Sequence, residues 1–217
     1  MIKASNIFKK YGDVEILKGI SLHIKESEVV SIVGASGAGK STLLHILGTL
    51  DKAENGNLSI NNTPISSLNA NELAKFRNAT IGFVFQFHYL LPEFTALENV
   101  IIPASIYNTK NDMIEKKAKE LLSYFGLSHR LNHKPSQMSG GEQQRVAVAR
   151  ALINTPKVIF ADEPSGNLDS NNAKELHQLF FQLRKDFNQT FVIVTHNESL
   201  ADMSDRKILL TDGRISN

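Results

Sequence analysis

The chain has 217 residues, of which 41% are hydrophobic and 21% charged, a size and composition typical of one globular domain with or without a subdomain. The complete lack of cysteine excludes disulfide scaffolds, thiolate metal sites and cysteine nucleophiles. The 24 Lys and Arg residues nearly balance the 22 Asp and Glu residues, so charge does not favour a nucleic-acid partner.

The first part of the chain predicts short antiparallel strands. Charged and apolar residues are mixed over residues 1–15, so we expect no secretory signal. Residues 1–30 and Leu58–Asn61 have the pattern of short strands, and Asn55-Gly56 is typical of a turn. We therefore expect a small antiparallel β-subdomain at the N-terminus.

Short and nearly continuous apolar runs recur along the chain, and such runs are typical of strands buried on both faces. They lie at Val29–Val33, Ile81–Phe85, Val158–Ala161 and Phe191–Val194. Helical periodicity marks the segments from Ile114 to Phe125 and from Leu176 to Leu183. Strands that alternate with helices predict an α/β fold with a mainly parallel sheet, which binds its ligand at the carboxyl ends of the strands.

One segment, from about residue 88 to residue 137, interrupts this alternation. Its pattern is helical and is punctuated by Pro92, Pro103 and Pro135. We predict that it forms a small helical subdomain inserted into a single domain that spans residues 1–217. The longest uncharged stretches, such as Ile81–Pro92, fall short of the roughly 20 apolar residues that a membrane helix needs, so no membrane span is expected.

A glycine-rich loop follows the first buried run. Gly34–Ser41 has the spacing G-x-x-x-x-G-K-S directly after Val29–Val33, which matches a P-loop. In such a loop backbone N–H groups wrap phosphate oxygens, while Lys40 would reach the β and γ phosphates and the Ser41 hydroxyl could ligate Mg²⁺. A chance glycine-rich turn is the alternative, but the preceding strand makes nucleotide phosphate binding the stronger prediction.

Two carboxylates end another buried strand. Asp162 and Glu163 directly follow the apolar run Val158–Ala161. Asp162 could hold Mg²⁺ through water, and Glu163 could accept a proton from a water that attacks the γ phosphate. An isolated Asp-Glu pair after a strand is more often a solvated turn, but the P-loop upstream favours a catalytic pair.

A turn of small residues, Met138–Arg145, precedes another helical pattern. Taken alone, Ser139 is most simply a helix N-cap. Taken with the P-loop, the turn is a second potential phosphate site. Two half-sites in one small chain suggest that Ser139–Gly141 of one copy closes over Gly34–Ser41 of another.

The last buried run, Phe191–Val194, continues into Thr195 and His196 at the edge where the other motifs converge. An imidazole there could bond the γ phosphate and fix the attacking water. A lone histidine is more often structural, and the other six are expected to be ordinary surface, core or interface residues: His23, His45, His88, His129, His133 and His177.

Together and in this order, the motifs resemble those of the ATP-binding subunits of ABC transporters over the whole chain. The resemblance implies a P-loop ATPase core with an antiparallel β-subdomain and an inserted helical subdomain. It also implies ATP as substrate, Mg²⁺ as cofactor and a head-to-tail sandwich of two copies around ATP.

The resemblance also assigns roles position by position. It assigns ATP binding to Tyr11, which would stack on adenine, and to Gly34, Ala35, Ser36, Gly37, Ala38, Gly39, Lys40, Ser41, Thr42, Ser139, Gly140, Gly141, Glu142 and Asp169. It assigns Mg²⁺ binding to Ser41, Gln86 and Asp162. It assigns catalysis to Glu163 as general base, with His196, Gln86 and Lys40.

Three segments, Gly48–Asp51, Phe85–Val100 and Asp162–Asp169, are also similar to the lipoprotein-releasing branch of this family. That similarity implies a peripheral ATPase at the cytoplasmic face of the inner membrane, coupled to separate membrane subunits that dock near Gln86 to Val100. The interface candidates are the aromatic residues Phe87, Tyr89 and Phe94. The MacB-type exporters of macrolides and peptides share much of the pattern but commonly carry a fused membrane domain, which we do not expect here.

Two other classes of function remain as alternatives. A small-molecule or nucleotide kinase could use the same P-loop, but it would leave Ser139–Arg145 without a purpose. A soluble ABC-type ATPase that acts on DNA or ribosomes usually has long coiled coils or two ATPase halves, and neither pattern occurs in the sequence. We therefore expect no nucleic-acid partner.

Overall fold

The structure is a computed structural model that describes residues 1–106 and 111–216. A four-stranded antiparallel sheet in the order β2-β1-β4-β5 contains β1 (Ile2–Tyr11), β2 (Val14–Ile24), β4 (Asn55–Ile60) and β5 (Thr63–Pro64). A six-stranded sheet in the order β10-β9-β3-β8-β7-β6 contains β3 (Val29–Val33), β6 (Ile81–Phe85), β7 (Val158–Asp162), β8 (Thr190–Val194), β9 (Arg206–Thr211) and β10 (Arg214–Ser216). All neighbours in this sheet pair in parallel except β9 and β10. The mainly parallel sheet with its helices confirms the predicted α/β fold class.

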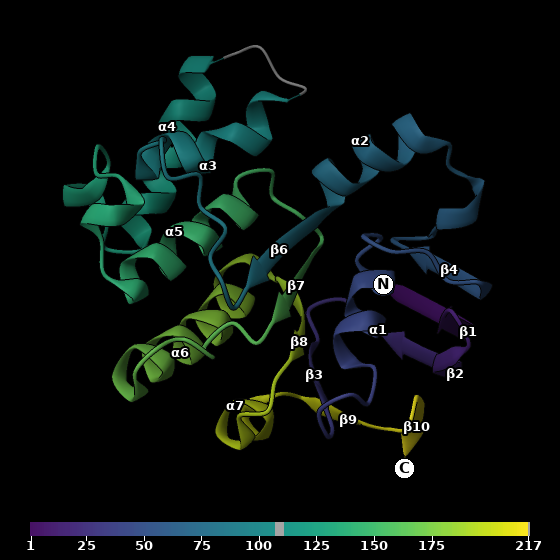
Figure 1. Ribbon diagram of the computed structural model, residues 1–217. Helices are drawn as coiled ribbons and strands as arrows, with labels where there is room; N and C mark the ends of the chain where they lie inside the picture. Colours follow the sequence, from purple (N-terminus) through teal and green to yellow (C-terminus); the bar gives the residue numbers. More distant parts are fainter. Residues whose placement is uncertain (107–110, 217) are drawn as a thin grey trace.

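Helices follow most strands of the large sheet along the chain and pack against its faces (Figure 1). They are α1 (Lys40–Leu47), α2 (Ala70–Thr80), α3 (Ala96–Ser105), α4 (Asn111–Tyr124), α5 (Gly140–Leu152), α6 (Ser170–Phe187) and α7 (Glu198–Met203). Three 3₁₀ turns occur at Ile65–Ser67, Ser128–Arg130 and Pro135–Gln137. Between β6 and α5 the described residues form helices and turns without a strand. Figure 1 shows α3 and α4 on the opposite side of the large sheet from β1, β2 and β4.

Each face of the large sheet has its own hydrophobic core. Ile159 and Ala161 of β7 face the core that includes α3, α4, α5 and α6, whereas Val158 and Phe160 face the core formed with α1 and the antiparallel sheet. This alternation explains why the strand sequences are apolar at consecutive positions. Among the described residues, no helix has the length and apolarity that crossing a bilayer requires.

The turn predicted at Asn55-Gly56 is wrong, because both residues belong to β4, where Asn55 pairs with Phe8 of β1 and Gly56 lies at a shift in the register. Gly56 has a φ of 106°, and a Cβ at this position would lie 2.3 Å from the carbonyl oxygen of Asn6. The glycine therefore serves a close approach between strands rather than a chain reversal. The chain turns at Asn61 and Asn62 instead, both of which have positive φ.

Candidate functional site

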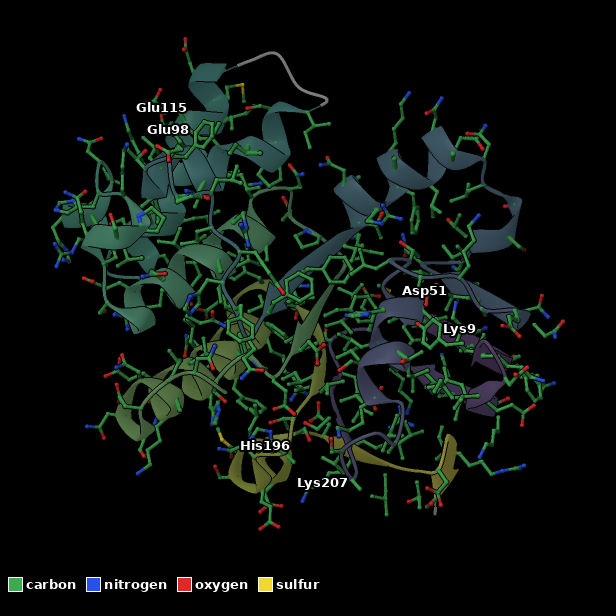
Figure 2. All side chains as sticks on the ribbon, in the orientation of Figure 1. Lys9, Asp51, Glu98, Glu115, His196 and Lys207 are labelled. Carbon is green, nitrogen blue, oxygen red and sulfur yellow. The ribbon has the colours of Figure 1, made fainter. Side chains whose placement is uncertain are left out.

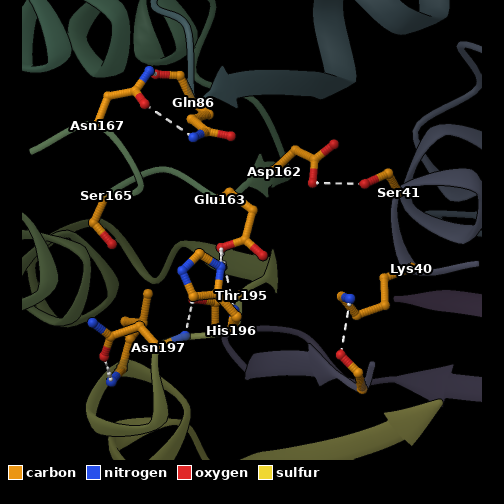
Figure 3. A network of polar contacts seen from close by, with 12 residues as sticks. Lys40, Ser41, Gln86, Asp162, Glu163, Ser165, Asn167, Thr195, His196 and Asn197 are labelled. Atoms are coloured by element: carbon orange, nitrogen blue, oxygen red, sulfur yellow. Dashed lines mark hydrogen bonds and ion pairs between the residues drawn. The ribbon is translucent and has the colours of Figure 1, made fainter. Parts of the chain in front are cut away.

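The register of the parallel sheet brings the predicted site residues to one edge. Phe85, Asp162 and Val194 are aligned across β6, β7 and β8, and Val194 pairs with Ile32 of β3. The loops that follow these strands therefore begin side by side, as the carboxyl ends of parallel strands do. Figure 3 shows the side chains from these loops converging between the strands and α1.

The loop from Gly34 to Ser41 connects β3 to α1. Gly34 has a φ of 149°, and a Cβ there would lie 2.1 Å from the carbonyl oxygen of Leu210, so the close packing on β9 requires glycine. Lys40 Nζ donates hydrogen bonds of 2.9 Å to the carbonyl oxygens of Gly34 and of Ala35. The ammonium group is thus held at the mouth of a loop that leads into a helix N-terminus, an arrangement that favours anions.

Asp162 links the end of β7 to this loop. Its Oδ1 accepts a 3.0 Å hydrogen bond from Ser41 Oγ, and its Oδ2 lies 3.6 Å from Nε2 of His45. Burial raises the pKa of Asp162 above its ordinary value, although the hydrogen bond from Ser41 opposes the shift. Two oxygen ligands at this separation suit Mg²⁺, which binds carboxylate and hydroxyl oxygens together with phosphates.

We expect Asp162→Asn to raise the thermal midpoint of the nucleotide-free protein at pH 7 by a few degrees. In a chain of this size, such a shift corresponds to a gain of about 1 kcal/mol in the free energy of unfolding. The folded-state pKa of Asp162 lies above the unfolded value, so its protonated form favours folding and this contribution is lost as pH rises through the folded pKa. The stability advantage of the variant should disappear at acidic pH, where both proteins carry a neutral side chain. Melting curves at several pH values would contradict this account if the gain were independent of pH.

Glu163 begins the loop after β7 and is paired with His196. Its Oε2 lies 2.9 Å from Nδ1 of His196 and accepts a 3.2 Å hydrogen bond from the backbone N–H of the same residue. The backbone of Glu163 has a φ of 45°, and its N–H donates to the carbonyl of Val194. The side chain of His196 is largely exposed, whereas that of Glu163 is mostly covered. The predicted general base and the predicted catalytic histidine are therefore in direct contact.

Gln86 follows β6 and contacts the loop after Glu163 rather than Asp162. Its side-chain amide donates a 3.0 Å bond to Oδ1 of Asn167, and Asn167 Nδ2 donates a 3.2 Å bond to the backbone carbonyl of Gln86. The fit is tight, since a Cβ on Gly166 would lie 2.8 Å from Nε2 of Gln86. Asp169 ends the same loop as the N-cap of α6, where it accepts hydrogen bonds from the N–H groups of residues 171 and 172.

Ser139 is the N-cap of α5, as its position in the sequence suggested. It forms a capping box with Glu142, in which Ser139 Oγ accepts from the Glu142 N–H and Glu142 Oε2 accepts a 2.7 Å bond from the Ser139 N–H. The hydrogen bond from the Ser139 backbone and the guanidinium of Arg130 at 2.8 Å lower the pKa of Glu142 to about 2. Gly141 packs on α6, where a Cβ would lie 2.2 Å from Oδ1 of Asn172.

Within the described part of one copy, the hydrogen bonds of the Ser139–Glu142 motif and those of the Gly34–Ser41 loop share no residue. Lys40, Ser41, Asp162, Glu163 and His196, in contrast, lie around one small region (Figure 3). The two motifs predicted to bind phosphate are therefore not linked by these hydrogen bonds within one copy, which agrees with a site completed by a second copy.

Tyr11 lies at the end of β1 and is 52% exposed. Its hydroxyl donates a 2.6 Å hydrogen bond to Oδ2 of Asp51, which also accepts a 2.7 Å bond from Lys9 Nζ through Oδ1. The Lys9 ammonium lies 4.9 Å from the centre of the Tyr11 ring. The hydrogen bond to Asp51 raises the pKa of Tyr11. The ring is therefore held in place by Asp51 and Lys9 while about half of the residue remains exposed to solvent. Figure 2 shows Lys9 and Asp51 close together in this region.

Sequence reasoning missed three polar residues that hold these groups: Asp51, Gln144 and His177. Gln144 is fully buried, and its amide donates to the carbonyl oxygens of Pro164 at 2.6 Å and Phe85 at 3.3 Å. His177 is 3% exposed on the apolar face of α6. A polar residue at a core position of a helical pattern is the signal that could have identified the last two.

Comparison with known proteins shows the family of this chain. A family model described as "ABC transporter" matches residues 17–166. The lipoprotein-releasing system ATP-binding protein LolD of Cytophaga hutchinsonii is 63% identical over 215 residues, which cover 99% of this chain and 98% of the relative. The protein of the same name from Bacteroides fragilis is 59% identical over 99% of this chain and all of its own length.

Solved structures agree with the sequence relatives. The dimeric structure of MJ0796, a bacterial ABC transporter cassette, superimposes with a TM-score of 0.91 at 44% identity over 100% of this chain and 97% of that one. A post-hydrolysis structure of the same ATP-binding cassette, bound to ADP and Pi, gives a TM-score of 0.90 at 43% identity and the same coverage. On this evidence the chain belongs to the ABC transporter family, as one of its ATP-hydrolysing cassettes.

Proposed function

We propose that the chain powers the release of lipoproteins from the inner membrane, as the ATP-hydrolysing subunit of an ABC transporter whose membrane subunits are separate chains. The full-length identity of 63% to a lipoprotein-releasing ATP-binding protein is the observation that carries the transport assignment. The P-loop, Asp162 and the pair of Glu163 with His196 at one sheet edge support the chemistry. The proposed location is the cytoplasmic face of that membrane.

In the proposed reaction, Glu163 accepts a proton from a water that attacks the γ phosphate in line. His196 holds this water in position, and Lys40 compensates the negative charge of the phosphates. Glu163 and His196 are already in contact, which supports a shared role. Bound Mg²⁺ would be held by Ser41 and Asp162, with Gln86 as a further ligand, and would neutralise charge on the phosphate oxygens. The bond to Asn167 uses Nε2 of Gln86, which leaves the amide oxygen Oε1 as the atom that would bind the metal.

The proposed assembly is a head-to-tail dimer in which Ser139–Glu142 of one copy meets the P-loop of the other. The dimeric state of the similar cassette supports this arrangement, as does the lack of hydrogen bonds between the two motifs within the described part of one copy. The capped N-terminus of α5 would then face the γ phosphate, where a helix N-terminus favours negative charge.

The proposed docking surface for the membrane subunits follows β6. Phe87 and Tyr89 are 62% and 65% exposed, and they lie close in sequence to a groove of about 440 Å³ lined partly by Phe85, Pro103 and Ile106. Arg150 at the end of α5 holds the loop by donating to the carbonyl oxygens of His88 at 2.7 Å and Tyr89 at 2.6 Å. Exposed aromatic side chains beside a groove with both apolar and polar lining suit an amphipathic helix of a partner protein.

Depletion in the native cell tests the transport assignment. When the chain is depleted, lipoproteins destined for the outer membrane should accumulate in the inner-membrane fraction, and the wild-type chain should restore their release while Glu163→Gln should not. Membrane subunits with large extracytoplasmic domains should co-purify with tagged Glu163→Gln in the presence of ATP. An unchanged lipoprotein distribution together with a defect in macrolide or peptide export would favour the MacB-type alternative.

The exposed ring of Tyr11 supports its proposed stacking on adenine. We expect Tyr11→Ala to raise the KM for ATP about tenfold with little change in kcat, since stacking of a base on an aromatic ring contributes about 1–3 kcal/mol. Tyr11→Phe keeps the ring, loses only the hydrogen bond to Asp51 and serves as the matched control. Steady-state kinetics would count against stacking if the alanine variant kept the wild-type KM.

A further inference from the structure

The loop from Glu163 to Asp169 lies between two buried polar side chains on different helices. Gln144 of α5 donates its amide to the carbonyl of Pro164 at 2.6 Å. On the other side, Nε2 of His177 on α6 lies 3.0 Å from Oγ of Ser165. His177 and Ser165 are 3% and 8% exposed, so water cannot readily replace this hydrogen bond.

His177 is unusual for its position. Its neighbours on the buried face of α6 are apolar, among them Leu176, Phe180 and Leu183. Burial lowers the pKa of the imidazole, which is therefore neutral at pH 7. Burial removes water from the imidazole, and a hydrogen bond is needed to offset the free-energy cost of this desolvation. Here that hydrogen bond is made with Ser165.

Backbone hydrogen bonds within the loop connect Ser165 to Glu163. The N–H of Gly166 donates to the carbonyl of Glu163 at 3.0 Å, and the N–H of Leu168 donates to the carbonyl of Ser165 at 3.1 Å. The loop therefore forms a tight turn with Glu163 at its start, where the backbone has a positive φ of 45° that must be held by its surroundings. Anchoring Ser165 fixes the turn two residues from the Glu163 carboxylate.

We propose that His177 is a positioning residue of the ATPase site, which acts through Ser165 to fix the backbone that carries Glu163. The inference rests on the proposed role of Glu163 as general base. His177 does not itself touch ATP; its effect is on the orientation of the base, to which a proton-transfer step is sensitive. The rate of hydrolysis, rather than ATP affinity, should therefore respond when the hydrogen bond is lost.

The test compares His177→Phe, which fills the site without a hydrogen bond, with His177→Gln, whose amide can replace Nε2. His177→Phe should lower kcat about tenfold and change the KM for ATP less than twofold, and His177→Gln should retain at least half of the wild-type kcat. Ser165→Ala removes the same bond from the loop side and should give a similar loss. The double variant His177→Phe/Ser165→Ala should be no slower than Ser165→Ala alone, because both changes break one interaction.

Leu183→Val is the matched control for stability, since Leu183 is buried on the same helix α6 and its side chain cannot form a hydrogen bond to the loop. It should lower the melting temperature and leave kcat unchanged. Wild-type kcat in His177→Phe, or losses that multiply in the double variant, would overturn the inference. If His177→Phe does not fold, a wild-type kcat in Ser165→Ala would overturn the inference in the same way. Undiminished hydrolysis in Glu163→Gln would instead overturn the base assignment.

Discussion

Glu163→Gln should bind ATP with an affinity within about twofold of wild type and lower kcat by a factor of at least about 100, since a positioned general base contributes about 10²–10⁴ to the rate. Glutamine keeps the size of the side chain and can still accept the hydrogen bond from the His196 N–H. It removes only the basic carboxylate, so binding and turnover should separate. Nucleotide titration and single-turnover hydrolysis of the purified protein measure the two quantities independently.

A control for the loss of a glutamate charge is Glu115→Gln on α4, where the carboxylate makes a surface ion pair with Lys119. Surface pairs of this kind contribute little to stability, and this variant should hydrolyse ATP normally. Hydrolysis at the wild-type rate in Glu163→Gln would remove Glu163 from the role of base and direct attention to other groups near the γ phosphate.

Two inactive variants should restore activity when mixed, if the site is shared between copies. Lys40→Ala disables the P-loop, and Ser139→Asp keeps a good N-cap while it adds a negative charge toward the phosphates. Each variant alone should retain less than about 1% of the wild-type rate. An equal mixture should recover about a quarter of it, since half of randomly formed dimers are mixed and each mixed dimer has one intact site of two.

The double variant Lys40→Ala/Ser139→Asp provides the second half of this experiment. In a shared site, each mixed dimer of wild type with the double variant has two damaged sites, so excess double variant should suppress wild-type hydrolysis. If each copy instead held a complete site, the double variant would leave wild-type activity intact and the two single variants would not complement. The two arms give opposite patterns for the two arrangements.

The groups of the site that occur in local patterns could be predicted from the sequence. The P-loop spacing identified Lys40 and Ser41, and buried strands that end in polar residues identified Asp162, Glu163 and His196. The pairings of Ser41 with Asp162 and of Glu163 with His196 follow from strand order, because parallel strands share their carboxyl edge.

Contacts that depend on tertiary packing could not be predicted in the same way. Asp51 holds Tyr11 from a loop after α1, and His177 reaches Ser165 only because α6 packs back on the sheet. The Asn55-Gly56 pair has the composition of a turn, yet pairing with β1 determines its conformation. In each case the sequence shows the residue type, whereas the partner is set by how distant elements pack.

Helix α5 has one of the proposed nucleotide motifs at its start and the anchor of the docking loop near its end. Ser139 caps one end, and Arg150 holds the carbonyl oxygens of His88 and Tyr89 at the other. A straight helix of 13 residues is about 20 Å long and resists bending because its interior hydrogen bonds are complete. Because such a helix moves as one body, displacement of Ser139 on closure of the proposed dimer around a nucleotide would also displace Arg150 and the loop that it holds.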